Sequence, residues 1–472
     1  MITRVLTVIY PFCGLAIAVL SFPSTMLAAS NSASGAPGLR WICSTKESQW
    51  QERHISGESS GAEASGVTPL KLNPEIAFQT IDGFGGCFNE LGWEALLALP
   101  AEKREQALKE LFDVRGANFN LGRAPIGAND FAGGWYSLDE TPGDYEMKDF
   151  SIERDRHGLI RFIHEAMKYQ PKLAVWGVPW CPPSWMTTNG RYCHGHIKDD
   201  PRTLQAYALY FAKYLKAYRE EGIRVYALYP QNEPVYSDNI YPQCGWTGEQ
   251  LDRFLRDYLI PHLKRERLDV EIWQGTITSK KLADYTDPVL GDPVTSPGVT
   301  GVGYQYAGQD ALKETHDKYP TKKLAQTETE CYGGVNTWEE GLMTFAHIVQ
   351  DTNHFAGSYF YWNIALDESQ LSRWNWRQNS LLTIDRRKET LVFNPEFFSM
   401  KHFSAAVHPG AKRIEVSGGP FPNVVGFQNS DGSKVVVFGN DTDKDLHAAL
   451  QIGAVVSEFE VPAKSMNTII LP

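Results

Sequence analysis

Two glutamates each end or directly follow an apolar run that is typical of a β-strand. Glu233 follows the segment 225–230 (VYALYP), and Glu328 ends the segment 322–328 (KKLAQTE). A carboxylate at the end of a buried strand is costly unless it is solvated, paired or functional. Two such carboxyls in one place can divide acid and nucleophile roles between them, provided that their surroundings hold their pKa values apart.

Hydrolysis of a glycosidic bond uses a pair of this kind. One carboxylic acid protonates the leaving oxygen, and the other carboxylate attacks the anomeric carbon or activates water. The competing interpretation is structural, because a lone glutamate at a strand end can cap a helix or form a surface ion pair. The two together, after the fourth and seventh expected strands, favour the catalytic interpretation.

The elements that must position the pair alternate between strands and amphipathic helices. Leu204, Phe211 and Tyr218 share one helical face, and Thr247 with Gln250 forms a capping-box pattern ahead of another helix. Eight strands alternating with helices predict a (β/α)8 TIM barrel, an α/β fold whose active site lies at the carboxyl ends of the strands. The expected strands are 78–83, 118–126, 172–180, 225–232, 270–277, 298–306, 322–328 and 357–366.

Changes in composition divide the chain into four expected parts. Residues 1–29 have a basic start, an apolar stretch and a small-residue end, which predicts a cleaved signal peptide and secretion. Pro11 and Pro23 interrupt that stretch and argue against a stable membrane anchor. We expect a linker and N-terminal strands over 30–75, the catalytic barrel over 76–400, and a β-domain of short strands over 401–472. This last part should form an all-β sandwich that recruits the strand near residue 43 and so is built from both chain ends.

Charge and the weaker motifs narrow the functional classes. The net charge of −11 argues against nucleic acid and anionic membranes as partners, since both favour clustered Lys and Arg. Residues 193–196 (CHGH) lack a second ligand pair at zinc-site spacing, so we expect no metal, and no organic cofactor is required. The glycine-rich stretch 82–86 is interpreted as a tight turn that leaves the first barrel strand. Six cysteines remain beyond the predicted signal peptide and could pair, with connectivity left open.

The chain resembles glycoside hydrolase family 30, the family of lysosomal glucosylceramidase and of microbial β-1,6-glucanases. The resemblance runs from residue 78 to the C-terminal β-domain and includes several ordered motifs. The family fold is a (β/α)8 barrel joined to a β-sandwich built from both chain ends, in agreement with the pattern above. The motifs are 78–86 (FQTIDGFGG), 123–125 (RAP), 179–185 (PWCPPSW), 232–234 (NEP) and 361–363 (YWN).

The resemblance also implies roles for individual residues. Glu233 would be the acid/base, Asn232 would contact the 2-hydroxyl of the sugar, and Arg123 would orient a catalytic carboxylate. For the aromatic members of the sugar-binding set, core packing is the alternative. The positions that match the sugar subsite nearest the scissile bond are Asp130, Trp180, Tyr306 and Trp362.

The nucleophile matches the family less cleanly. Family members often have a hydroxyl residue, Glu, a small residue and Cys in a row, whereas this chain has TETEC over 327–331. Alignment through the strand and its Thr-Glu gives Glu328, while alignment through Cys331 puts a threonine at the nucleophile position. Glu330 shares a strand face with Glu328, because side chains alternate. We expect Glu328, with Glu330 as the alternative.

The sequence therefore predicts a secreted retaining β-glycosidase that acts by double displacement. We expect a β-linked oligosaccharide, polysaccharide or glycoside as substrate, with β-1,6-glucan or short β-glucosides first. The alternatives are β-xylosides, β-fucosides, β-1,6-galactan and glucosylceramide, because loops decide among sugars. A carbohydrate-binding barrel without activity is the non-enzyme alternative. Binding alone needs neither a nucleophile nor an acid, which favours the enzyme.

Overall fold

A computed structural model describes residues 39–55, 58–59, 67–235, 238–329 and 332–472. The predicted signal peptide lies outside these residues, as do Glu330 and Cys331. None of the helices in the described ranges combines the length and the apolar character that crossing a membrane requires.

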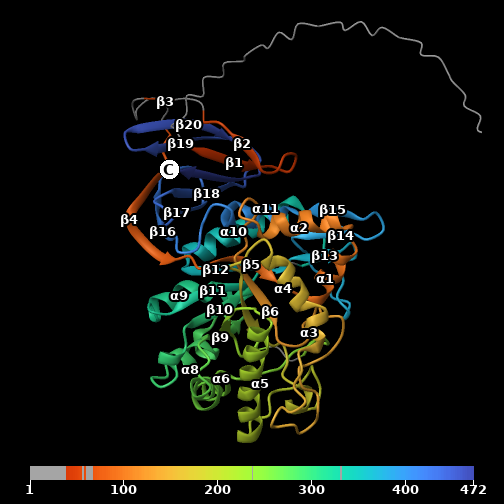
Figure 1. Cartoon of the computed structure of the whole chain (residues 1–472). Helices are drawn as coiled ribbons and strands as arrows, with labels where there is room; N and C mark the ends of the chain where they lie inside the picture. Colours follow the sequence, from red (N-terminus) through yellow and green to blue (C-terminus); the bar gives the residue numbers. More distant parts are fainter. Residues whose placement is uncertain (1–38, 56–57, 60–66, 236–237, 330–331) are drawn as a thin grey trace, which may run out of the picture. The chain divides into compact units, whose positions relative to one another are not determined.

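Eight parallel strands close into a barrel in chain order, with β12 paired to β5 (Figure 1). This confirms the predicted barrel, and each expected strand segment overlaps its strand, although the first shares only Gly83 with it. The barrel strands are β5 (Gly83–Cys87), β6 (Leu121–Pro125), β7 (Ala174–Val178), β8 (Val225–Leu228), β9 (Glu271–Ile277), β10 (Gly301–Gln305), β11 (Lys323–Glu328) and β12 (Ala356–Asn363).

The first barrel strand is not where the sequence pattern put it. Residues 78–80 belong to β4 (Lys71–Thr80), which pairs antiparallel with β16 (Lys412–Ser417) in the other domain. The glycine-rich stretch that we expected to be a turn is β5 itself. A Cβ at Gly85 would lie 1.8 Å from the carbonyl oxygen of Leu121, so the approach of β5 to β6 requires glycine. Glycine is depleted in strands, and this hid β5 in the sequence.

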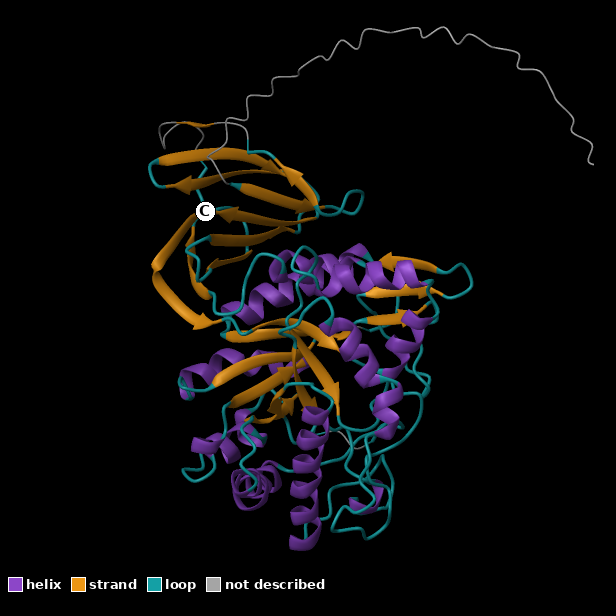
Figure 2. Cartoon of the chain, viewed as in Figure 1, coloured by secondary structure: helices purple, strands orange, loops and turns teal. Residues whose placement is uncertain are grey.

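Helices surround the barrel strands (Figure 2). Leu204, Phe211 and Tyr218 form a buried face of α5 (Pro201–Glu220), as predicted, and the structure adds that Asp200 caps the amino end of this helix. The capping box of Thr247 and Gln250 at α6 (Gly248–Arg253) is also present. The other helices are α1 (Glu90–Leu97), α2 (Ala101–Phe112), α3 (Glu153–His157), α4 (Leu159–Met167), α7 (Ile260–Arg265), α8 (Thr286–Leu290), α9 (Leu312–Lys318), α10 (Trp338–Asn353) and α11 (Pro395–Ser404).

The second domain is the predicted sandwich. Its larger sheet has the order β2-β1-β21-β18-β17-β16-β4, and its smaller sheet has the order β19-β20-β3. The N-terminal strand β1 pairs with β21, with Trp41 opposite Ile469, which confirms that both chain ends build the domain. Its strands are β1 (Arg40–Ser44), β2 (Gln51–Arg53), β3 (Glu58–Ser59), β17 (Asn423–Gln428), β18 (Lys434–Asn440), β19 (Leu446–Ile452), β20 (Val455–Val461) and β21 (Ser465–Leu471).

Polar contacts tie the sandwich to the barrel helices. The Trp338 indole of α10 donates to the carbonyl of Lys464 at 2.8 Å. His402 of α11 is fully buried, and its ring nitrogens lie 2.9 Å from the hydroxyls of Ser44 and Thr468. A small sheet of β13 (Ala365–Asp367), β14 (Leu382–Asp385) and β15 (Thr390–Phe393) follows the last barrel strand.

Candidate active site

Arg123 joins the polar residues at the carboxyl ends of the barrel strands. It lies in β6, is fully buried, and donates to Oε2 of Glu328 and, at 2.5 Å, to Oδ1 of Asn232. The hydroxyl of Tyr306 donates to Oε1, the other carboxylate oxygen of Glu328. Glu328 therefore has a donor on each oxygen, one of them a buried guanidinium, and these two hydrogen bonds fix the orientation of its carboxyl group.

Three indole rings surround the Arg123 guanidinium. Its central carbon lies 5.0 Å from the ring centroid of Trp176, 4.4 Å from that of Trp180 and 5.0 Å from that of Trp362. A desolvated cation over an aromatic face gains on the order of 2 kcal/mol. The rings and the Glu328 carboxylate together compensate for burying the charge, and they fix the guanidinium in place.

Asn232 is held in one orientation by donors from three barrel strands. Its Oδ1 accepts from Arg123 of β6, from the Thr276 hydroxyl of β9 at 2.8 Å, and from the Gln305 amide of β10 at 3.3 Å. Because all three groups donate to the oxygen, the Nδ2 amine of Asn232 is turned away from them. Asn232 can therefore offer an N–H donor to a ligand hydroxyl.

Glu233 lies in a buried turn after β8. Its backbone N–H donates to the carbonyl of Thr276 at 3.1 Å, and its φ of 43° is left-handed. A left-handed φ is uncommon for a residue other than glycine and is a form of backbone strain that gathers at functional sites. Burial, followed by the negative charge of Glu328, raises the pKa of Glu233 to about 8. The carboxyl is therefore protonated at neutral pH.

Asp130 is a second buried carboxyl beside Glu328. Burial and the Glu328 charge raise its pKa to about 8. The Trp362 indole lies against this carboxyl and lowers its pKa a little, against the effect of burial. Within the described residues, neither Oδ1 of Asp130 nor the indole nitrogen of Trp362 makes a well-formed hydrogen bond. Buried polar atoms are rarely left unpaired, and a polyhydroxylated ligand offers such atoms both donors and acceptors.

A cavity of about 230 Å³ brings these groups together. The predicted residues Asp130, Trp180, Tyr306, Glu233 and Glu328 line it, while Arg123, Asn232 and Trp362 contact these residues without lining it. No group of residues suited to hold a metal ion occurs in the described part of the chain. The other lining residues, which the sequence did not single out, are Asn239, Tyr241, Tyr332, Trp376 and Gln378.

Thr276 and Gln305 were also missed by the sequence analysis. Both lie at carboxyl ends of barrel strands, β9 and β10, and this position is the one signal that could have found them. Tyr241 and Trp376 lie on loops. Loops have no regular sequence periodicity from which a side chain that faces a cavity could be predicted. Glu330, the alternative nucleophile, lies outside the residues that the structure describes.

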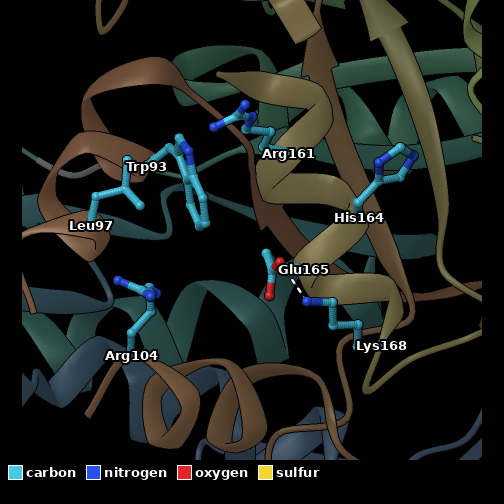
Figure 3. A pocket seen from close by; sticks show the side chains of 7 residues that line it. All are labelled: Trp93, Leu97, Arg104, Arg161, His164, Glu165 and Lys168. Atoms are coloured by element: carbon cyan, nitrogen blue, oxygen red, sulfur yellow. Dashed lines mark hydrogen bonds and ion pairs between the residues drawn. The ribbon is translucent and has the colours of Figure 1, made fainter. Parts of the chain in front are cut away.

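A larger hollow of about 500 Å³ lies among α1, α2 and α4, and its lining residues are shown in Figure 3. Its one carboxylate, Glu165, is paired with Lys168 at 2.5 Å. The lining has no second carboxyl, and its remaining charged groups are Arg104 and Arg161. This hollow therefore lacks the pair of carboxyls that lines the smaller cavity.

The fold and the paired carboxyls at its strand ends define a glycoside hydrolase of the TIM-barrel class. The family model described as the glycosyl hydrolase family 30 TIM-barrel domain matches residues 81–407, and that of the family's beta sandwich domain matches residues 410–469. The chain belongs to glycosyl hydrolase family 30.

Relatives agree with this family. The chain is 28% identical to mouse lysosomal acid glucosylceramidase over 430 residues, which cover 85% of this chain and 83% of the mouse protein. It is 26% identical to an endo-1,6-β-D-glucanase of Trichoderma harzianum over 420 residues, 84% of each protein. Among solved structures, SrfJ of Salmonella typhimurium superimposes with a TM-score of 0.84 at 25% identity, over 92% of this chain and 99% of that one.

Proposed function

We propose that this glycoside hydrolase is a retaining β-glycosidase with Glu233 as acid/base and Glu328 as nucleophile. One observation carries the proposal. The two carboxyls share a cavity, yet burial and a neighbouring negative charge raise the pKa of Glu233, while Arg123 and Tyr306 donate to both oxygens of Glu328. A neutral acid beside a fixed carboxylate is the division of roles that double displacement needs.

In the first step, an oxygen of Glu328 attacks the anomeric carbon and the bond to the leaving oxygen breaks. Glu233 gives its proton to that oxygen, so the leaving group departs as a neutral alcohol. The glycosyl-enzyme ester on Glu328 carries no charge. Since the Glu328 charge is one of the causes of the raised pKa of Glu233, its loss lowers that pKa and favours the carboxylate.

In the second step, the Glu233 carboxylate takes a proton from water as the water oxygen attacks the anomeric carbon. The ester bond breaks, and Glu328 regains its charge and its donors. Two displacements at one carbon restore the β-configuration of the sugar. Arg123 and Tyr306 act through Glu328, whereas Asn232 would bind the 2-hydroxyl through its Nδ2. No step of this mechanism takes a metal or an organic cofactor.

We propose a β-glucosyl substrate, either β-1,6-glucan or a short β-glucoside. The support is that a relative is named a glucosylceramidase and another an endo-1,6-β-glucanase. The cavity of about 230 Å³ suits a single sugar ring, with Asp130 and the Trp362 indole available to its hydroxyls. The predicted signal peptide at residues 1–29 supports action outside the cytoplasm.

The test is a substrate screen followed by proton NMR of the first product. The screen contains β-1,6-glucan, gentiobiose, glucosylceramide and aryl β-glucoside, β-xyloside, β-fucoside and β-galactoside. We expect turnover of the β-glucosides and a first-formed sugar in the β-anomer. An α-anomer would establish inversion, and binding without any turnover would support the carbohydrate-binding alternative.

A further inference from the structure

Two segments from different parts of the barrel meet at the edge of the catalytic cavity. Residues 332–337 lie between β11 and α10, and the second segment lies between β13 and β14. Tyr332 of the first segment and Gln378 of the second both line the cavity and pair as an antiparallel β-bridge. The N–H of Gly333 donates to the carbonyl of Arg377 at 3.3 Å. The proposed mechanism uses neither segment.

Asn379 is the side chain that fastens the two segments together. It is 2% exposed, and its Oδ1 accepts from the backbone N–H of Gly334 at 2.7 Å and from that of Val335 at 3.2 Å. Its Nδ2 donates to the carboxyl of Glu340 at 3.1 Å and to that of Glu396 at 2.8 Å. The reverse orientation of the amide would set its amine against two N–H donors, so these contacts fix the orientation.

The fastened segment places Tyr332 on a second aromatic residue. The rings of Tyr332 and Tyr306 are stacked, with centroids 5.6 Å apart and planes inclined by 19°. The Tyr306 hydroxyl donates to Glu328, the proposed nucleophile. Tyr306 also has a left-handed φ of 51°, which is strained for a bulky residue and persists only where the surroundings enforce it. The stack on Tyr332 is one such support.

We propose that Asn379 and Tyr332 are positioning residues for the first step of the reaction. Asn379 fixes the turn that carries Tyr332. The Tyr332 ring then keeps the hydroxyl of Tyr306 on Glu328, which orients the carboxylate that attacks the anomeric carbon. The inference rests on the proposed function, because it takes Glu328 as the nucleophile.

The experiment measures kcat/KM of Asn379→Ala and Tyr332→Ala with β-glucosyl fluoride and with a β-linked disaccharide. Each variant should lose about five- to tenfold, the order of one aromatic stacking contact, and by the same factor on both substrates. A residue that only contacted the leaving group would affect the disaccharide alone, because the leaving group of the fluoride is a single atom. Tyr332 is 50% exposed, so Tyr332→Ala keeps the test decisive if Asn379→Ala fails to fold.

A double-mutant cycle with Tyr306→Phe separates positioning from a general loss of structure. Tyr306→Phe keeps the stacked ring but removes the hydroxyl that the stack positions. In that background, Tyr332→Ala and Asn379→Ala should each cost less than about twofold further, because the effects of coupled residues are not additive. A loss of folded protein would instead multiply with the effect of Tyr306→Phe.

Asn429→Ala is the matched control for Asn379→Ala. Asn429 is also buried, and it lies between β17 and β18. Its Oδ1 accepts from the N–H of His408 and its Nδ2 donates to the carbonyl of Ala406, both at 2.9 Å. The variant should lower Tm and leave kcat/KM per folded enzyme unchanged.

Two results would overturn the inference. One is an unchanged kcat/KM for β-glucosyl fluoride in both single variants. The other is a loss that persists in full in the Tyr306→Phe background. A wild-type chain that turns over none of the β-glycosides would instead refute the proposed function, and this inference with it.

Discussion

At the scale of single residues, the nucleophile can be assigned by the stereochemistry of rescue. Glu328→Ala should lose at least a thousandfold in kcat, because no covalent intermediate can form. Added azide should enter the space left by the side chain and give an α-glycosyl azide, identified by NMR. Glu330→Ala is the matched control and should stay active. A dead Glu330→Ala beside an active Glu328→Ala would reassign the nucleophile to Glu330.

The protonation state of Glu233 makes a separate prediction about pH. Its pKa of about 8 in the free enzyme means that kcat/KM for a poor leaving group should fall as the pH rises through that value, since the acid form is lost. Dinitrophenyl β-glucoside needs no protonation of its leaving group. Its glycosylation rate, measured as a pre-steady-state burst, should be insensitive to pH in this range.

Glu233→Gln provides the control for this pH dependence. The variant should lose the alkaline limb for the poor leaving group and accumulate glycosyl-enzyme with the dinitrophenyl substrate. An alkaline limb that persists in Glu233→Gln would show that another group, such as Asp130, controls the profile.

The sequence located residues of the candidate site better than it located the contacts that hold them in place. Glu233, Asn232 and Arg123 stand in recognisable motifs beside strands, and they do come together. The orientation of Asn232 could not be predicted, because it depends on Thr276 and Gln305 from two other strands. Polar residues at strand ends are common, and only closure of the barrel shows which of them meet.

At the scale of elements, the hairpin after β13 carries two tryptophans, Trp374 and Trp376, whose indole rings have different neighbours. Leu371 and Arg377 pair as a β-bridge at its base. Trp376 is 38% exposed, lines the cavity and lies 6.1 Å from the Tyr241 ring. Trp374 packs instead on Tyr192, with ring centroids 6.3 Å apart, and does not line the cavity. We expect Trp376, a part-exposed member of the lining, to contact the leaving group rather than the buried sugar ring.

Trp376→Ala should therefore lower kcat/KM for a β-linked disaccharide by about five- to tenfold, the loss expected for one ring-stacking contact. The rate with β-glucosyl fluoride, whose leaving group is a single atom, should be unchanged. Trp374→Ala is the matched control from the same hairpin and should leave both rates unchanged. An equal loss on both substrates would place Trp376 in the sugar subsite instead.

The strands show what an apolar pattern can and cannot predict. β8 and β11 are short strands that end in buried residues, and the sequence located both. β5 escaped because its glycines, required by the approach of β6, lower its strand propensity.

At the scale of the whole molecule, buried ionisable groups set the pH of greatest stability. Burial raises the pKa values of Asp130, Glu233 and Glu396 to about 8. Between pH 4.5 and 8 the folded chain thus holds protons that the unfolded chain has lost, so stability falls as the pH rises through this window. Burial lowers the pKa of His402 to about 3, so its contribution is lost as the pH falls from 6.5 towards 3.

These opposing slopes predict a maximum of Tm near pH 4.5. The three carboxyls outweigh His402 between pH 4.5 and 6.5. Below pH 4.5 they are protonated in both the folded and the unfolded chain, so His402 sets the slope there. Calorimetric scans between pH 3 and 9 measure the profile, and we expect Tm to fall by several degrees from pH 5 to pH 8. A maximum at pH 8 would contradict the balance between these groups.

Glu396 offers the sharpest test, because it stands apart from the catalytic cavity on α11. One of its oxygens accepts from the Asn379 amide at 2.8 Å, and the other has no hydrogen-bond partner among the described residues. Glu396→Gln keeps a carbonyl acceptor for Asn379 but cannot ionise. At pH 8 the variant should melt several degrees above the wild type, and at pH 5 the two should melt together. Glu339→Gln, at an exposed position of α10, is the control. It should leave the difference between the Tm at pH 5 and the Tm at pH 8 unchanged. If Glu396→Gln shifts Tm equally at both pH values, the charge of Glu396 does not set the alkaline limb.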